Sequence, residues 1–137
     1  MKRQGILNSD ISRVLSYMGH KDQICIGDCG LPVPDETERI DLALRFGLPS
    51  FMDVLTEVVA DMKIEKIILT EEIKEQNPAS LNEIIEFFKG SENGLPEIEY
   101  VSHEQLKEMT RSCKAVIRTG ETKAFVNIIL QSACIFA

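Results

Sequence analysis

The polar side chains best suited to proton chemistry flank one short apolar run. His20 precedes residues 23–27, which are typical of a buried strand, and Asp28 follows them. An imidazole can both give and take a proton near neutral pH. Ligands usually bind at the carboxyl ends of strands in open α/β sheets, so Asp28 stands where a ligand site is expected. The pair is a candidate for acid–base chemistry.

Each candidate side chain also has a purely structural interpretation. His20 follows a predicted helix, and a solvated imidazole is ordinary at that pole. Asp28 could bond the backbone of its own turn, and His103 could be an exposed residue in the first turn of a helix. Asn127 borders an apolar strand and could be a satisfied edge or turn amide. From the residues alone these alternatives stay open.

Other chemistries have no support in the motifs. Residues 27–30 do not form a dinucleotide fingerprint, and the chain has neither a Walker-type phosphate loop nor a Gly-x-Ser-x-Gly elbow. Cys25, Cys29, Cys113 and Cys134 lie in or beside apolar segments without a Cys-x-x-Cys pair, which favours buried reduced thiols. With only two histidines in the chain, we expect no structural metal and no cofactor.

Length and charge set the broad class of protein. The 137 residues are expected to form one domain, residues 1–137, which would bury about two-thirds of its unfolded surface. A net charge of -7 with scattered Lys and Arg argues against a nucleic-acid or anionic-membrane partner. No apolar run reaches the roughly 20 residues of a membrane span, and the first residues lack a signal-peptide hydrophobic region. We therefore expect a cytoplasmic protein.

Alternating helical and strand patterns predict the elements that carry these residues. Apolar residues at 11, 14, 15 and 18 predict a helix capped by Asn8 or Ser9, with Gly19 as its left-handed terminal residue. Further helices are expected from Ser50 to residue 62, over 78–88, and after Ser102. Strands are expected at 23–27, 40–44, 66–70, 98–101, 115–117, 127–130 and 133–136, the last two as one or two closing strands. The pattern predicts a three-layer α/β/α domain around a mostly parallel mixed sheet, with antiparallel pairing at its end.

Several separate blocks of the chain resemble one known family. The blocks are residues 2–8, 19–20, 27–34, 39–42, 102–104 and 117–121, followed by Asn127. In collinear order they are similar to the D-ribose pyranase branch of the ribose/fucose mutarotase family, and the resemblance runs to about residue 136. Residues 30–34 and 39–41 match the ribose branch, whereas the fucose branch differs there.

The resemblance implies a reaction and a set of site residues. Members interconvert the β-pyranose and β-furanose forms of D-ribose by opening and reclosing the ring, which supplies furanose for phosphorylation and needs no cofactor. By this resemblance His20 is the general acid. Asp28, His103, Phe125, Val126 and Asn127 contact the sugar.

One departure from the family concerns Phe125. Ribose pyranases typically carry an aromatic residue with a hydroxyl at this position, and this chain has none there. Phe125 can still form a wall of the pocket, but any hydrogen bond from that hydroxyl is lost. A mutarotase for another sugar such as fucose, or a non-catalytic sugar-binding subunit on the same scaffold, therefore remains an alternative.

The resemblance also implies self-association. Members form ring-like homo-oligomers of two stacked pentamers, in which C-terminal residues of one subunit complete the pocket of its neighbour. The apolar tail over residues 128–136 is consistent with such an interface, although a buried strand would have the same composition.

Overall fold

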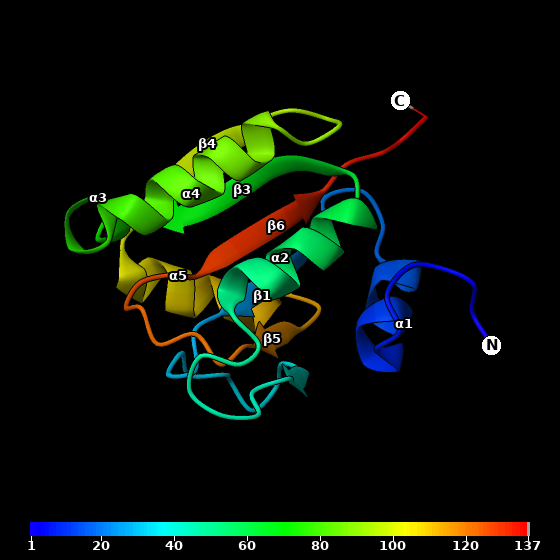
Figure 1. Cartoon of the computed structure of the whole chain (residues 1–137), viewed down its shortest axis with the longest axis horizontal. Helices are drawn as coiled ribbons and strands as arrows, with labels where there is room; N and C mark the ends of the chain where they lie inside the picture. Colours follow the sequence, from blue (N-terminus) through cyan, green and yellow to red (C-terminus); the bar gives the residue numbers. More distant parts are fainter. Residues whose placement is uncertain (137) are drawn as a thin grey trace.

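A mixed sheet organises the chain in the computed structural model, which describes residues 1–136. These residues form six strands in the order β2-β5-β1-β6-β3-β4 (Figure 1). The strands are β1 (Gln23–Gly27), β2 (Arg39–Asp41), β3 (Ile64–Thr70), β4 (Glu97–Val101), β5 (Val116–Arg118) and β6 (Ile128–Ser132). The helices are α1 (Ser9–Tyr17), α2 (Phe51–Ala60), α3 (Ile73–Gln76), α4 (Pro78–Lys89), α5 (His103–Met109) and the 3-10 turn η1 (Thr110–Ser112).

The strand directions explain why ligand-binding loops can gather at one edge. β1 and β2 both pair parallel with β5, and β3 pairs parallel with β4. β6 lies antiparallel between β1 and β3, so within residues 1–136 the other five strands share one direction. This confirms the predicted α/β fold around a mostly parallel mixed sheet. The predicted antiparallel pairing of the last strand is also confirmed, but its partners are β1 and β3 rather than β5, the strand before it.

The two faces of the sheet build two apolar clusters. Alternate strand residues such as Ile24, Ile67 and Ile128 pack with α1, α2 and α4, of which α2 and α4 lie in front of the sheet in Figure 1. Their neighbours Cys25 and Ile129 pack with α5 on the opposite face. Side chains in a strand alternate between faces, so these apolar strands are covered on both sides.

Local capping groups begin the helices where the sequence indicated. Asn8 Oδ1 accepts a hydrogen bond from the Ile11 amide at 2.9 Å, which makes Asn8 the cap of α1. Ser50 and Asp53 form a reciprocal capping box at α2. Ser102 accepts a bond from the Gln105 amide at the start of α5.

Several local expectations are wrong. Gly19 does not take the left-handed conformation, which Lys21 adopts instead at φ 78°. The expected strand over 40–44 is only Arg39–Asp41, because after the bond from Leu42 N to Arg118 O the chain leaves β5. Residues 133–136 are not a strand, since β6 reaches the start of β3 at Ser132 and the chain then leaves the sheet. Of the apolar tail over residues 128–136, Ile128–Ser132 is therefore a buried strand, and residues 133–136 are not.

Candidate functional site

A cavity of about 480 Å³ opens at the carboxyl edge of the parallel strands. Asp28 follows β1, His103 begins α5 after β4, and Phe125 lies in the loop that enters β6. Glu121 and the exposed Phe46 complete the principal walls. The cavity thus brings together three residues predicted from sequence, which lie far apart along the chain.

Asp28 is held by hydrogen bonds from both sides of its loop. Its backbone amide donates to Asn127 Oδ1 at 2.8 Å, and its Oδ1 accepts from the Gly30 amide at 2.9 Å. Burial raises the pKa of the Asp28 carboxyl above its ordinary value, although the hydrogen bond from the Gly30 amide acts in the opposite direction. Asn127 therefore holds the backbone of Asp28, and Gly30 holds its carboxylate, which is partly removed from water.

His103 and Asn127 carry polar atoms that have no partner among residues 1–136. The buried atoms are His103 Nδ1 and Asn127 Nδ2. The His103 amide is bonded to the Glu72 carboxylate at 3.0 Å and its ring packs edge-on against Phe125, with centroids 5.1 Å apart. A buried polar group without a partner costs about 1–3 kcal/mol. A ligand with hydroxyl groups would offer both atoms a partner.

Phe125 adopts a backbone conformation that bulky residues rarely take. Its φ is 66°, in the left-handed region. Asn77 Nδ2 donates to the carbonyl of Ala124, which ties the preceding residue to the start of α4. Strain of this kind costs about 1–3 kcal/mol and is concentrated at functional sites. It turns the aromatic ring of Phe125 toward His103 and the cavity.

Glu121 lines the cavity but was assigned no role from sequence, although residues 117–121 were part of the family resemblance. Its Oε1 accepts from the Phe51 amide at the start of α2, and its Oε2 accepts from the Thr122 amide. The carboxylate thus joins the first turn of α2 to the loop that lines the cavity. The signal that could have found it was its position in a matching block, since an isolated Glu in a turn has no distinctive spacing.

Three predicted site residues do not line this cavity, and of these only Asn127 lies next to it, bonded to the Asp28 amide. The Val126 side chain is buried in the larger apolar cluster and is therefore part of the core. His20 lies before the amino end of β1, whereas Asp28 follows the carboxyl end of the same strand. The five residues of β1 separate them by roughly 17 Å, at about 3.3 Å a residue. Within one chain, His20 and the cavity are therefore two separate places.

The part of the chain described here, residues 1–136, contains no group of three or more His, Cys, Asp or Glu side chains that could hold a metal ion. No helix within it is long and apolar enough to cross a membrane.

Comparisons with known proteins agree with one another. A family model described as the RbsD / FucU transport protein family matches residues 1–135. A D-ribose pyranase of Streptococcus uberis is 52% identical over 132 residues, which are 96% of this chain and 97% of that protein. The structure of Bacillus subtilis RbsD complexed with D-ribose superposes with a TM-score of 0.92 at 44% identity, covering 99% of this chain and 100% of that one. A fucose mutarotase from Streptococcus pneumoniae, solved with L-fucose, shares the fold with a TM-score of 0.73 at 22% identity, covering 94% of both chains.

Proposed function

The chain belongs to the RbsD / FucU transport protein family, and from this membership we propose that it is a D-ribose pyranase. It is an isomerase that interconverts the β-pyranose and β-furanose forms of D-ribose. Full-length relatives at about half identity carry that name. The ribose-bound relative has nearly the same fold over the whole chain.

The chemistry of the cavity is the observation that carries the proposal. A pyranose presents hydroxyl groups around its rim and C–H groups on its faces. The Asp28 carboxylate and His103 Nδ1 can bond hydroxyls, and Phe125 provides an apolar wall. Asn127, directly behind Asp28, supplies a further free donor. These groups suit a small sugar without a phosphate or other charge.

The reaction needs only proton transfers at oxygen. As the bond from C1 to the ring oxygen breaks, its electron pair stays on that oxygen, which takes a proton from protonated His20. The hydroxyl on C1 loses its proton to water and becomes the aldehyde. Closure through the C4 hydroxyl reverses these transfers, returns the proton to His20 and leaves the furanose. General acid catalysis of this type contributes roughly 10²- to 10⁴-fold.

We infer further that His20 serves the cavity of a neighbouring subunit. The length of β1 keeps the imidazole away from Asp28 of its own chain. In an assembly, His20 of one copy can approach the cavity of the next copy, so that His20 and Asp28 act on the same sugar. A ring-like homo-oligomer, which we expect to be a decamer, would allow this contact. Exposed apolar side chains suit such contacts: Phe46 at the cavity and Ile135 and Phe136 in the tail, which would reach the neighbour's pocket.

The cysteines support a cytoplasmic location. Cys25 and Cys113 are buried, and all four cysteines are free thiols. Burial raises the pKa of the Cys113 thiol to about 12, so it stays protonated and unreactive. A reducing compartment suits four thiols without a disulfide.

Saturation-transfer NMR on D-ribose at equilibrium tests the proposed function. We expect this protein to accelerate exchange between pyranose and furanose signals, and the His20→Ala variant to lose that acceleration. Acceleration that survives in His20→Ala would refute the role of His20.

The same measurement separates the two alternatives. No acceleration with ribose but acceleration of L-fucose exchange would indicate a fucose mutarotase. No acceleration of either sugar, together with ribose-induced shifts of the Asp28 amide, would indicate a binding subunit, which the missing hydroxyl at Phe125 favours.

A further inference from the structure

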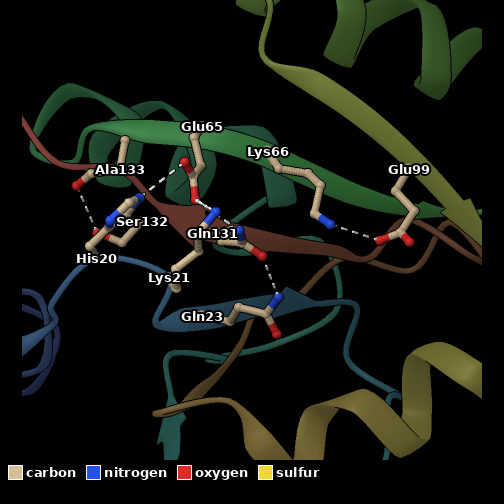
Figure 2. Close-up of polar contacts among 9 residues, drawn as sticks. All are labelled: His20, Lys21, Gln23, Glu65, Lys66, Glu99, Gln131, Ser132 and Ala133. Carbon is tan, nitrogen blue, oxygen red and sulfur yellow. Dashed lines mark hydrogen bonds and ion pairs between the residues drawn. The ribbon is translucent and has the colours of Figure 1, made fainter. Parts of the chain in front are cut away.

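His20 belongs to a polar network on one face of the sheet, although its side chain is 46% exposed (Figure 2). Its Nε2 lies 3.2 Å from Glu65 Oε2 in β3. The other oxygen of Glu65 accepts from Gln131 Nε2 at 2.9 Å and lies 3.1 Å from Lys21 Nζ. Gln131 Oε1 in turn accepts from Gln23 Nε2 at 2.9 Å. The network therefore spans β1, β6 and β3.

A β-bulge turns Glu65 toward this face. Ile64 pairs with Ser132 and Lys66 pairs with Gln131, although Ser132 and Gln131 are adjacent in β6. Glu65 is therefore an extra residue in β3 without a partner in β6. Ile64 and Ile67 both pack against the larger apolar cluster. The bulge thus lets Glu65 join Gln131 on the opposite face, whereas strict alternation would bury a carboxylate beneath α2 and α4.

The backbone around His20 is anchored to the same strand end. The amide of Lys21 donates to the Ser132 carbonyl at 2.9 Å, and the amide of Ser132 donates to the Asp22 carbonyl at 2.8 Å. Asp22 Oδ2 also accepts from the Gly19 amide at 2.8 Å. With its turn closed and both following residues bonded to Ser132, His20 has little freedom except rotation of its side chain.

The protonation of this contact follows from its chemistry. Hydrogen bonds from Gln131, Lys21 and His20 lower the pKa of Glu65 to about 2, so the carboxylate is ionised at neutral pH. An ionised carboxylate only accepts hydrogen bonds. His20 Nε2 must therefore carry a proton to bond Glu65, which leaves Nδ1 as the nitrogen that can exchange a proton with a ligand.

We propose that Glu65, braced by Gln131, is a positioning residue that holds His20 with its proton on Nε2 and presents Nδ1 to the sugar in a neighbouring subunit's cavity. This inference rests on the proposed function, because it assigns a supporting group to the general acid of that reaction. Protonated Nδ1 gives its proton to the ring oxygen during opening and takes one back from the C4 hydroxyl during closure. Between these two transfers His20 is a neutral imidazole with its proton on Nε2; Glu65 stabilises the imidazolium that exists before opening and after closure, and it stays ionised throughout.

The test compares Glu65→Gln with a matched control in the full-length assembled protein. Glutamine keeps the shape of the side chain, but its amide can donate a hydrogen bond as well as accept one. It can therefore bond an unprotonated Nε2, which allows the His20 proton to sit on Nδ1 instead. The control is Glu99→Gln, which removes a carboxylate that pairs with Lys66 at 3.3 Å on the same sheet and contacts no part of His20 (Figure 2). Size-exclusion chromatography with light scattering checks that each variant keeps the assembly of the unmodified protein.

Three readouts distinguish positioning from a structural role. The ¹⁵N shifts of the His20 ring should show the Nε2–H tautomer in the unmodified protein and in Glu99→Gln, and a mixture of tautomers in Glu65→Gln. Ribose exchange at saturating sugar should fall roughly 5- to 10-fold in Glu65→Gln, as expected for loss of one partly exposed charge-assisted bond. Ribose affinity, measured from shifts of the Asp28 amide, should change by less than about 2-fold, because the cavity groups are intact.

Contrary outcomes are specific to each proposal. An unchanged tautomer, or an exchange rate in Glu65→Gln equal to that of Glu99→Gln, would overturn the role of Glu65 while leaving the pyranase activity intact. A protein that does not accelerate ribose exchange at all would refute the proposed function instead, and the tautomer measurement would still decide whether Glu65 orients His20.

Discussion

Two inactive variants should restore each other's activity when their subunits mix. His20→Ala removes the proposed general acid, and Asp28→Ala removes the carboxylate of the cavity. The two side chains lie at opposite edges of the sheet, about 17 Å apart along β1. If each working site takes His20 from one subunit and Asp28 from its neighbour, a mixed assembly contains some sites with neither lesion.

The size of the recovery follows from this geometry. In a random 1:1 mixture, half of the subunits supply an intact His20 and half supply an intact Asp28, so about one-quarter of the sites are intact. A 3:1 mixture should give about 19% of the activity of the same amount of unmodified protein, by the same product of fractions. A site built within one chain would give no recovery at any ratio, because every chain carries one lesion.

The assay uses differently tagged variants that are co-expressed, purified through both tags and measured by saturation-transfer NMR on D-ribose. The matched control pairs Asp28→Ala with His103→Ala, because both residues line the cavity of one subunit. Every cavity in that mixture carries a lesion, so it should stay inactive. Absence of recovery in the first pair, or equal recovery in the control, would refute a site shared between subunits.

Three further perturbations test the cavity and the core. Phe125→Tyr should tighten ribose binding roughly 2- to 12-fold by adding one hydrogen bond of about 0.5–1.5 kcal/mol, and an unchanged affinity in an NMR titration would show that the hydroxyl finds no partner. Because burial raises the pKa of Asp28 above 3.8, the folded state binds more protons than the unfolded state just above that pH, and stability falls as pH rises through the folded pKa. As pH rises through that folded pKa, Asp28→Asn should therefore become more stable than the unmodified protein, and it should stay more stable at neutral pH. Urea midpoints of the two proteins that keep a constant difference from acidic to neutral pH would contradict this prediction. Ile129→Ala should lower the free energy of unfolding by about 2–5 kcal/mol, because Ile129 is fully buried in the central strand β6, and a loss below about 1 kcal/mol in urea titration would contradict its place in the core.

Helix starts and buried strands could be predicted because their causes are local. Asn8, Ser50 and Ser102 each accept a hydrogen bond from the amide three residues after them, so the signal lies within one turn of sequence. Strands such as residues 23–27 are marked by their apolar composition. The left-handed residue was assigned wrongly to Gly19 instead of Lys21, because bonds from β6 to the turn outweigh the local preference of glycine.

The candidate site could be predicted only in part. Asp28, His103 and Asn127 were predicted from their places at strand ends and from the family resemblance, and the structure joins Asp28 and Asn127 through a bond across 99 residues. Glu65 was missed because a bulge leaves no mark in the apolar pattern of β3. A carboxylate between Ile64 and Lys66 resembles any charged residue at the start of a strand.

By itself, the sequence determined the α/β class, the helix starts and the side chains available for proton transfer, because these depend on residue types and near neighbours. Only the tertiary structure decided that β6 inserts antiparallel between β1 and β3, that Glu65 contacts His20, and that His20 lies away from the cavity. Those features come from contacts between residues 45 to 108 positions apart along the chain, which depend on the packing of the whole sheet.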